Sequence, residues 1–172
     1  MKSRDIAIVG ILLAIGAILR FVFNMFPGAI VGNPVIALYC LAIILIRPTM
    51  KEAAGIGLVA GVLSMLISHS IFPPANLISE PLGALVCAAV YGMISERTVL
   101  SPAVTTFLAT CASGFSFVFV SMIVMLASVV ATPTGTIMGF FLAVLPIVLL
   151  TAAFNMVVTQ ILFFPAKRIL SR

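Results

Sequence analysis

Charged side chains are scarce in this sequence. Only 8% of its 172 residues are Asp, Glu, Lys or Arg, whereas a soluble domain has about 25%. Hydrophobic residues make up 63% of the chain, and its mean hydropathy is +1.38. This composition excludes an ordinary soluble domain and predicts one integral membrane domain over residues 1–172.

The sequence also lacks the motifs of common catalytic and metal sites. It has no G-x-x-x-x-G-K-[ST], H-E-x-x-H or G-x-S-x-G motif, and it has a single histidine. Cys40, Cys87 and Cys111 lie far apart in apolar surroundings without a C-x-x-C pair, so they are interpreted as packing residues. The absences favour a protein that is not an enzyme, holds no metal or other cofactor, and does not hydrolyse ATP through a phosphate loop.

The positions of the basic residues predict the topology. Eight of the nine share one side of the membrane if the chain crosses it six times: Lys2, Arg4, Arg47, Lys51, Arg97, Lys167, Arg168 and Arg172. Because cytoplasmic loops collect Lys and Arg, both termini are expected on the cytoplasmic side of the cell membrane. The same rule explains the net charge of +5 without a nucleic-acid partner. Arg20 is the exception.

Apolar runs predict an all-α, polytopic bundle of six transmembrane helices. The expected spans are about residues 6–26, 34–46, 51–71, 79–94, 102–130 and 136–164. A helix needs about 20 residues to cross the hydrocarbon core, so the second span is short unless part of 29–33 enters the protein. The fifth is long and must tilt or include an interfacial turn. Pro146 predicts a kink in the sixth.

Polar residues inside a membrane are costly unless paired, so each one is a candidate site residue. Arg20 lies about 21 Å along a helix from Ile6, at about 1.5 Å per residue, which places it in the outer third of the bilayer. The candidate substrate-binding residues are Arg20, Asn33, His69, Asn76, Glu80 and Asn155. All but Asn155, expected near the middle of its span, converge on the outer half. Such a group suits a small polar or zwitterionic solute arriving from outside.

Every member of this group has a structural alternative. Arg20 can snorkel to the outer headgroups, and Glu80 can be a first-turn acid or simply the partner of Arg20. His69 can be a hydrogen-bonded packing residue. The amides can cap turns or join neighbouring helices: Asn33, Asn76 and Asn155.

A zwitterionic amino acid fits the two charges. Arg20 can clamp a carboxylate with two parallel hydrogen bonds, and Glu80 can receive an ammonium group. Aromatic and sulfur side chains expected around an aromatic solute are Met25, Phe26, Phe72 and Phe115. A tryptophan-like solute fits this chemistry, and another aromatic or weakly polar solute fits it nearly as well.

Two pairs of small residues have the spacing that lets helices approach closely. Gly57 and Gly61 form a G-x-x-x-G pair, for which packing inside the bundle is the preferred interpretation. Gly10 and Ala14 form a similar pair on the first span. For them, docking of another membrane protein competes with internal packing.

The chain resembles the S components of energy-coupling factor (ECF) transporters, and among them the tryptophan-transport (TrpP-like) group. The resemblance lies in IVGILLAIGAIL (8–19), in residues 34–66, in FPPANLISEPLGALV (72–86) and in residues 144–165. It implies a substrate-binding subunit that works with a transmembrane coupling protein and two cytoplasmic ATPases, which hydrolyse the ATP. It also implies that Gly10 and Ala14 contact the coupling protein.

The chain departs from that group in the expected binding region. Asn33-Pro34-Val35 stands where the group tends to show Lys-Pro-Asp, residues 75–80 replace a Pro-Asn-x-x-Asp-Lys-like turn, and Arg20 replaces a histidine. The substrate is therefore open between tryptophan and another micronutrient such as a vitamin. A non-transporting membrane protein, in which Arg20 and Glu80 only pair, is the alternative from a different class. A stand-alone carrier is weaker because the two halves show no repeat.

Overall fold

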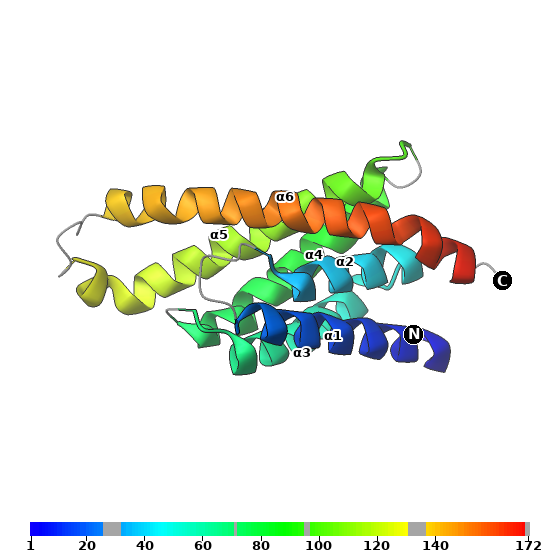
Figure 1. Ribbon diagram of the computed structural model, residues 1–172, viewed down its shortest axis with the longest axis horizontal. Coiled ribbons are helices and arrows are strands. Elements are labelled where there is room, and N and C mark those ends of the chain that lie inside the picture. Colours follow the sequence, from blue (N-terminus) through cyan, green and yellow to red (C-terminus); the bar gives the residue numbers. More distant parts are fainter. Residues whose placement is uncertain (26–31, 71, 95–96, 131–136, 171–172) are drawn as a thin grey trace.

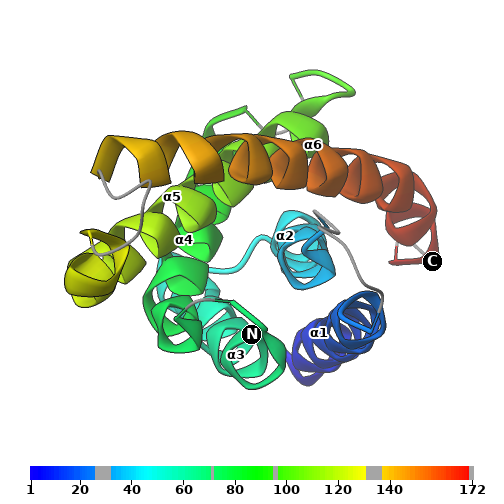
Figure 2. The same ribbon diagram turned by 60° about the vertical axis from the view of Figure 1, so that its left-hand side comes forward.

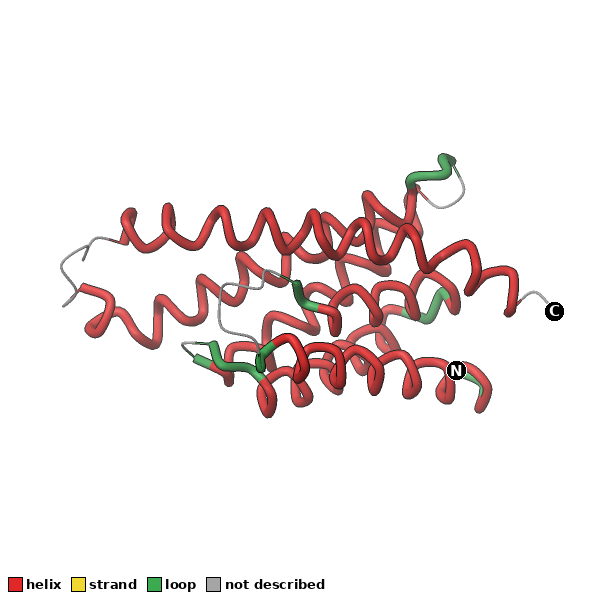
Figure 3. Tube along the Cα trace, in the orientation of Figure 1, coloured by secondary structure: helices red, strands yellow, loops and turns green. Residues whose placement is uncertain are grey.

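The computed structural model describes residues 1–25, 32–70, 72–94, 97–130 and 137–170, and the regular secondary structure of those parts is all helical (Figure 1). Its helices are α1 (Ser3–Phe23), α2 (Pro34–Ile46), α3 (Met50–Ile67), α4 (Asn76–Ile94), α5 (Ser101–Val130) and α6 (Ile137–Leu170). A 3-10 turn, η1 (Pro73–Ala75), precedes α4. Figure 3 shows no strand among the described residues, as an all-α bundle requires.

Most helix bounds follow the predicted spans, and α2 matches its span at both ends. The largest difference is that α6 continues past the predicted end at 164, through Pro165, to Leu170. In addition, α3 ends at Ile67 rather than 71 because Ser68 turns to an extended conformation. The fifth span was expected either to tilt or to include an interfacial turn. It forms one continuous helix of 30 residues, α5, without an interfacial turn.

The start of α4 was also predicted too late. The helix begins at Asn76, not at 79, because η1 leads directly into it. The side-chain amide of Asn76 donates to the carbonyl of Pro73 at 2.7 Å and joins the two elements. As a result Asn76, Ser79 and Glu80 all belong to the first turns of one helix.

Five of the described helices are long and apolar enough to cross a membrane, and α2 is a shorter apolar helix. With 13 residues, α2 is about 20 Å long at a rise of about 1.5 Å per residue, less than the hydrocarbon thickness. Residues 34–44 are all buried. Figure 2 shows α2 in the middle of the other five helices, and it contacts all of them. A helix that is apolar on every side suits such a central position.

Glycines bring α3 close to the start of α4. A Cβ on Gly57 would lie 2.5 Å from the Cα of Pro81, and one on Gly61 would lie 2.6 Å from the carbonyl oxygen of Asn76. Both clashes are with backbone, which cannot rotate away. The prediction that this G-x-x-x-G pair packs inside the bundle is confirmed, and the close contact positions Glu80 beside α3.

The outer face of α1 has a different character. Its buried residues are Val9, Leu13 and Gly16. Gly10 and Ala14 are exposed, and a Cβ on Gly10 would meet nothing within 4 Å. The small-residue stripe of α1 is therefore not a packing contact within the described part of this chain, and it faces outward.

The helices alternate in direction, so both marked chain ends lie at the same end of the bundle (Figure 1). The side chain of Arg4 donates to the carbonyl of Leu170 at 3.0 Å, and the amino group of Met1 pairs with Glu52. The ends of α1, α3 and α6 that lie at this end of the bundle are thus tied together. This arrangement agrees with the single side predicted for the basic residues, although Arg172 lies outside the described residues. The assignment of that side to the cytoplasm stays a prediction.

Candidate functional site

A cavity of about 410 Å³ lies between α1, the α3–α4 connection, α4, α5 and α6. Sites for small molecules range from about 300 to 1,000 Å³, so the cavity can hold one small solute. Five of the six predicted substrate-binding residues line it: Arg20, Asn33, His69, Asn76 and Glu80. The sixth, Asn155, lies behind them.

Arg20 points into the bundle rather than toward the headgroups. Its Nη1 donates to Asn33 Oδ1 and to Ser64 Oγ, both at 2.9 Å. Its Nη2 donates to Ser68 Oγ at 3.3 Å. The protein encloses most of the Arg20 side chain, of which 14% is exposed. The same side chain lines the cavity. The snorkelling alternative is therefore wrong in this structure.

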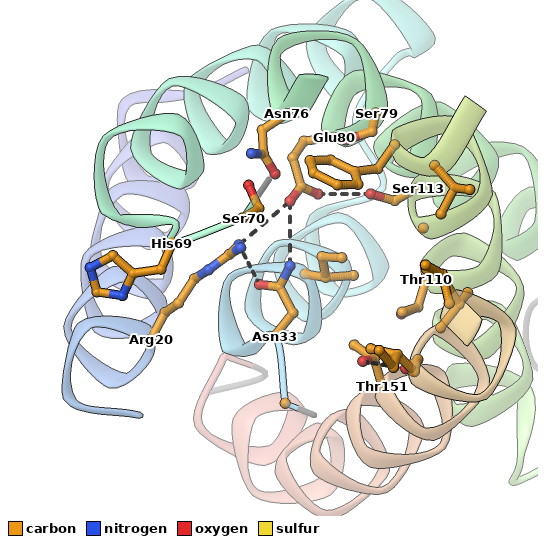
Figure 4. Close-up of a pocket in the computed structure, with 18 of the residues that line it drawn as sticks. Arg20, Asn33, His69, Ser70, Asn76, Ser79, Glu80, Thr110, Ser113 and Thr151 are labelled. Atoms are coloured by element: carbon orange, nitrogen blue, oxygen red, sulfur yellow. Dashed lines mark hydrogen bonds and ion pairs between the residues drawn. The ribbon is translucent and has the colours of Figure 1, made fainter. Parts of the chain in front are cut away.

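Glu80 is the buried counter-charge. Its side chain is 1% exposed, and its Oε1 lies 3.8 Å from the Nη1 of Arg20 (Figure 4). Oε1 also accepts hydrogen bonds from Ser64 Oγ at 3.3 Å and from Asn33 Nδ2 at 3.5 Å, and Oε2 accepts one from Ser113 Oγ at 3.2 Å. A carboxylate this deep in an apolar bundle needs such partners to stay charged. The structural alternative in which Glu80 is the partner of Arg20 therefore agrees with the structure.

Asn33 links the two charges and is itself held from behind. Its side chain accepts from Arg20 and donates to Glu80. Its backbone N–H donates to Asn155 Oδ1 at 3.3 Å, and Asn155 donates to Thr110 Oγ1 at 3.3 Å. Asn155 is fully buried and is not among the lining residues. Asn155 thus joins α6 to the start of α2 and to α5, which agrees with the alternative that it bonds neighbouring helices. Its contact with a solute stays a prediction.

Asn76 and His69 occupy different positions along the wall. The Asn76 side chain caps the turn at Pro73 and is 3% exposed, so its structural alternative is confirmed although it lines the cavity. His69 is exposed just beyond the end of α3, and Figure 4 shows its ring turned away from Glu80. Its position is the edge of the cavity, not the hydrogen-bonded cluster.

The predicted aromatic wall was largely wrong. Phe115 lies on the far side of α5, where its ring stacks on Phe141 with centroids 6.2 Å apart. Met25 is 70% exposed, and Phe26 lies outside the described residues. Phe72 is not among the lining residues either. The apolar wall is instead formed by Ile36, Phe117, Val118, Val144, Ile147 and Val148. Phe115 and Phe117 are two residues apart, which turns them to opposite faces of a helix.

The sequence predictions missed the small hydroxyl residues. Ser64 and Ser113 bond Glu80, Ser68 bonds Arg20, and Ser70 and Ser79 line the cavity. The spacing of Thr106, Thr110 and Ser113 in an otherwise apolar segment was the available signal, because residues three or four apart share one helix face. Serine and threonine are common in membrane helices, which weakened that signal.

The sequence of this chain is similar over its full length to that of a transport protein. Its sequence is 26% identical to the probable tryptophan transport protein of Bacillus subtilis (strain 168) over 176 aligned positions, which cover 100% of this chain and 95% of the relative. This similarity supports a family relationship. This similarity and the five long apolar helices together support the interpretation that this chain is a multi-pass membrane protein. No protein-family model matches the chain, and no solved structure matches it.

Proposed function

We propose that this protein is the substrate-binding S component of an ECF-type importer and that it binds tryptophan or a related small aromatic zwitterion. The observation that carries the proposal is the cavity, in which a cation and a carboxylate 3.8 Å apart share a wall with Phe117 and five aliphatic side chains. The name of the similar Bacillus subtilis protein supports tryptophan among the solutes that fit.

The hydrogen-bond inventory leaves room for a zwitterion. A guanidinium group has five N–H donors, and three of those of Arg20 reach acceptors on described residues. The remaining two suffice for a carboxylate clamp. Three described side chains donate to Glu80, and because its carboxylate lines the cavity beside them, we propose that it also accepts from the ammonium group. Because Arg20 and Glu80 cancel in charge, a neutral zwitterion adds no net charge to an apolar site.

The outward stripe on α1 supports a partner in the membrane. We propose that a transmembrane coupling protein packs against Gly10 and Ala14 and that two cytoplasmic ATPases supply the energy. Small exposed residues four positions apart let a second helix approach closely. Around them α1 also exposes Ile6, Ile11 and Ile18 at 59%, 60% and 63%, an apolar surface that lipid covers when no partner is bound.

The test is a binding measurement on the purified protein. Because the chain contains no tryptophan, the protein has no indole emission of its own, and the change in emission of an added indole on binding can be followed. We expect saturable binding of L-tryptophan, and we expect Arg20→Lys to weaken it about 10- to 100-fold, because hydrogen bonds to charged groups contribute about 1.5–3 kcal/mol. Arg4→Lys is the matched control, since Arg4 bonds Leu170 at the opposite end of the bundle.

Two results would contradict the assignment. A folded Arg20→Gln protein that binds tryptophan as tightly as the wild type would remove Arg20 from the site. If no amino acid or vitamin in a panel binds, the non-transporting alternative is favoured. The observation behind that alternative is that the cluster around Glu80 already links α1, α2, α3, α4 and α5.

A further inference from the structure

Ser79 carries a buried hydroxyl that no described residue satisfies. The side chain is 1% exposed, its Oγ has no hydrogen-bond partner among the described residues, and the residue lines the cavity. Two other hydroxyls in or near the wall do find acceptors: Thr151 donates to the carbonyl of Ile147 at 2.7 Å, and Ser116 to that of Ala112 at 2.7 Å. In a membrane helix such back-bonding is the usual solution for serine and threonine.

An unsatisfied hydroxyl in an apolar bundle costs free energy, so its retention in a cavity wall points to a ligand. Among the described residues of the wall, Ser70 Oγ also lacks a partner. Ser70 lies two residues after Ser68, which bonds Arg20, and so belongs to the charged end. Figure 4 shows Ser79 on the other side of Glu80 from Arg20. Ser79 is thus placed away from the groups proposed to bind the carboxylate.

The geometry points to Ser79 as the residue that accepts a hydrogen bond from the ring N–H of the solute and so selects an indole over rings without that group. This inference rests on the proposed function. With the carboxylate and ammonium bound by Arg20 and Glu80, an indole solute has one polar atom left, its ring nitrogen, which is a donor only. A hydroxyl oxygen is the matching acceptor, and the apolar side chains of α5 and α6 cover the rest of the ring.

A site that hydrogen-bonds a solute group rejects an analogue that lacks it, because the protein group is then left unpaired. The probe pair is L-tryptophan and 3-(3-benzothienyl)-L-alanine, in which sulfur replaces the ring N–H with little change in shape. By calorimetry on the wild-type protein we expect tryptophan to bind about 5- to 100-fold more tightly, the range for one unmade buried hydrogen bond.

Ser79→Ala should abolish or reverse the preference for tryptophan, because the indole N–H then loses its acceptor and only the apolar contacts remain. Tryptophan binding should fall while benzothienylalanine binding stays the same or improves. Ser121→Ala is the matched control: Ser121 is 2% exposed and its hydroxyl also lacks a partner among the described residues, but it does not line the cavity. We expect it to keep the wild-type ratio.

Folding does not confound this comparison. Removing an unpartnered buried hydroxyl leaves no new polar group unsatisfied, so both variants should unfold at the wild-type temperature or above it. The inference is overturned if Ser79→Ala keeps the wild-type ratio, or if it weakens both ligands equally. It is also overturned if wild-type protein binds both ligands equally well, and in that case the proposed function stands. If wild-type protein binds neither ligand, the proposed function fails with it.

Discussion

Neutralising one member of the buried Arg20–Glu80 pair should be far more harmful than neutralising both. At 3.8 Å and an effective dielectric constant of about 20, the Coulomb attraction is about 4 kcal/mol. Arg20→Gln leaves a carboxylate that is 1% exposed without its counter-charge, and Glu80→Gln leaves the guanidinium without its own. Breaking a buried pair in this way costs about 3–5 kcal/mol, whereas a neutral pair of similar volume avoids the uncompensated charge.

The assay is a double-mutant cycle on the free energy of unfolding, measured by SDS titration of the purified protein in mixed micelles. We expect each single variant to lose about 3–5 kcal/mol, and the double variant to lose less than either single variant. Lys167→Gln serves as a control for loss of a charge, because Lys167 is exposed and lies over the Phe163 ring, 5.6 Å from its centroid. It should cost less than about 1 kcal/mol.

Additivity of the two single variants to within about 0.5 kcal/mol would refute this reasoning. The two charges would then be held independently, Arg20 by the hydroxyls of Ser64 and Ser68 and Glu80 by Ser113, with no energetic coupling between them. The measurement is independent of any ligand, so it separates the structural role of the pair from its proposed role in binding.

Two further predictions concern the membrane and the partner. On a cysteine-free background, Pro74→Cys should react with an external thiol reagent and Arg47→Cys only from the cytoplasmic side; the reverse pattern would refute the topology. Gly10→Val with Ala14→Val should reduce uptake while solute affinity stays near wild type, because the branched side chains block a close helix contact. Gly55→Val is the matched control, since a Cβ there also meets nothing within 4 Å, and wild-type uptake by the Gly10–Ala14 variant would remove α1 as the docking face.

Much of the helical framework could be predicted because the bilayer imposes strong rules on sequence. Apolar runs interrupted by Pro, Gly and basic residues predicted six helices, and the predicted bounds of the central helix α2 agree with the structure at both ends. The same rules singled out Arg20 and Glu80, since an ionisable residue inside a span needs a partner. The helix ends that were misplaced, at Asn76 and after 164, depend on local capping and on proline tolerated within a helix.

Periodicity alone did not decide which side chains meet. Phe115 and Phe117 are equally aromatic, and only the packing of α5 between α4 and α6 turns the second one to the cavity. The stripes of small residues on α1 and α3 look alike in sequence. In the structure Gly57 and Gly61 lie against the backbone of α4, whereas Gly10 has no neighbour within 4 Å of a Cβ.

The sequence by itself determined that this chain is a bundle of apolar helices with opposite charges at one depth, because the cost of burying polar groups in lipid acts on each helix separately. Only the tertiary structure decided which partners those charges have. The hydrogen bonds of Glu80 come from Asn33, Ser64 and Ser113, on three different helices or their ends. Such contacts depend on how the helices rotate and pack against one another, and that is a property of the whole bundle rather than of any one segment.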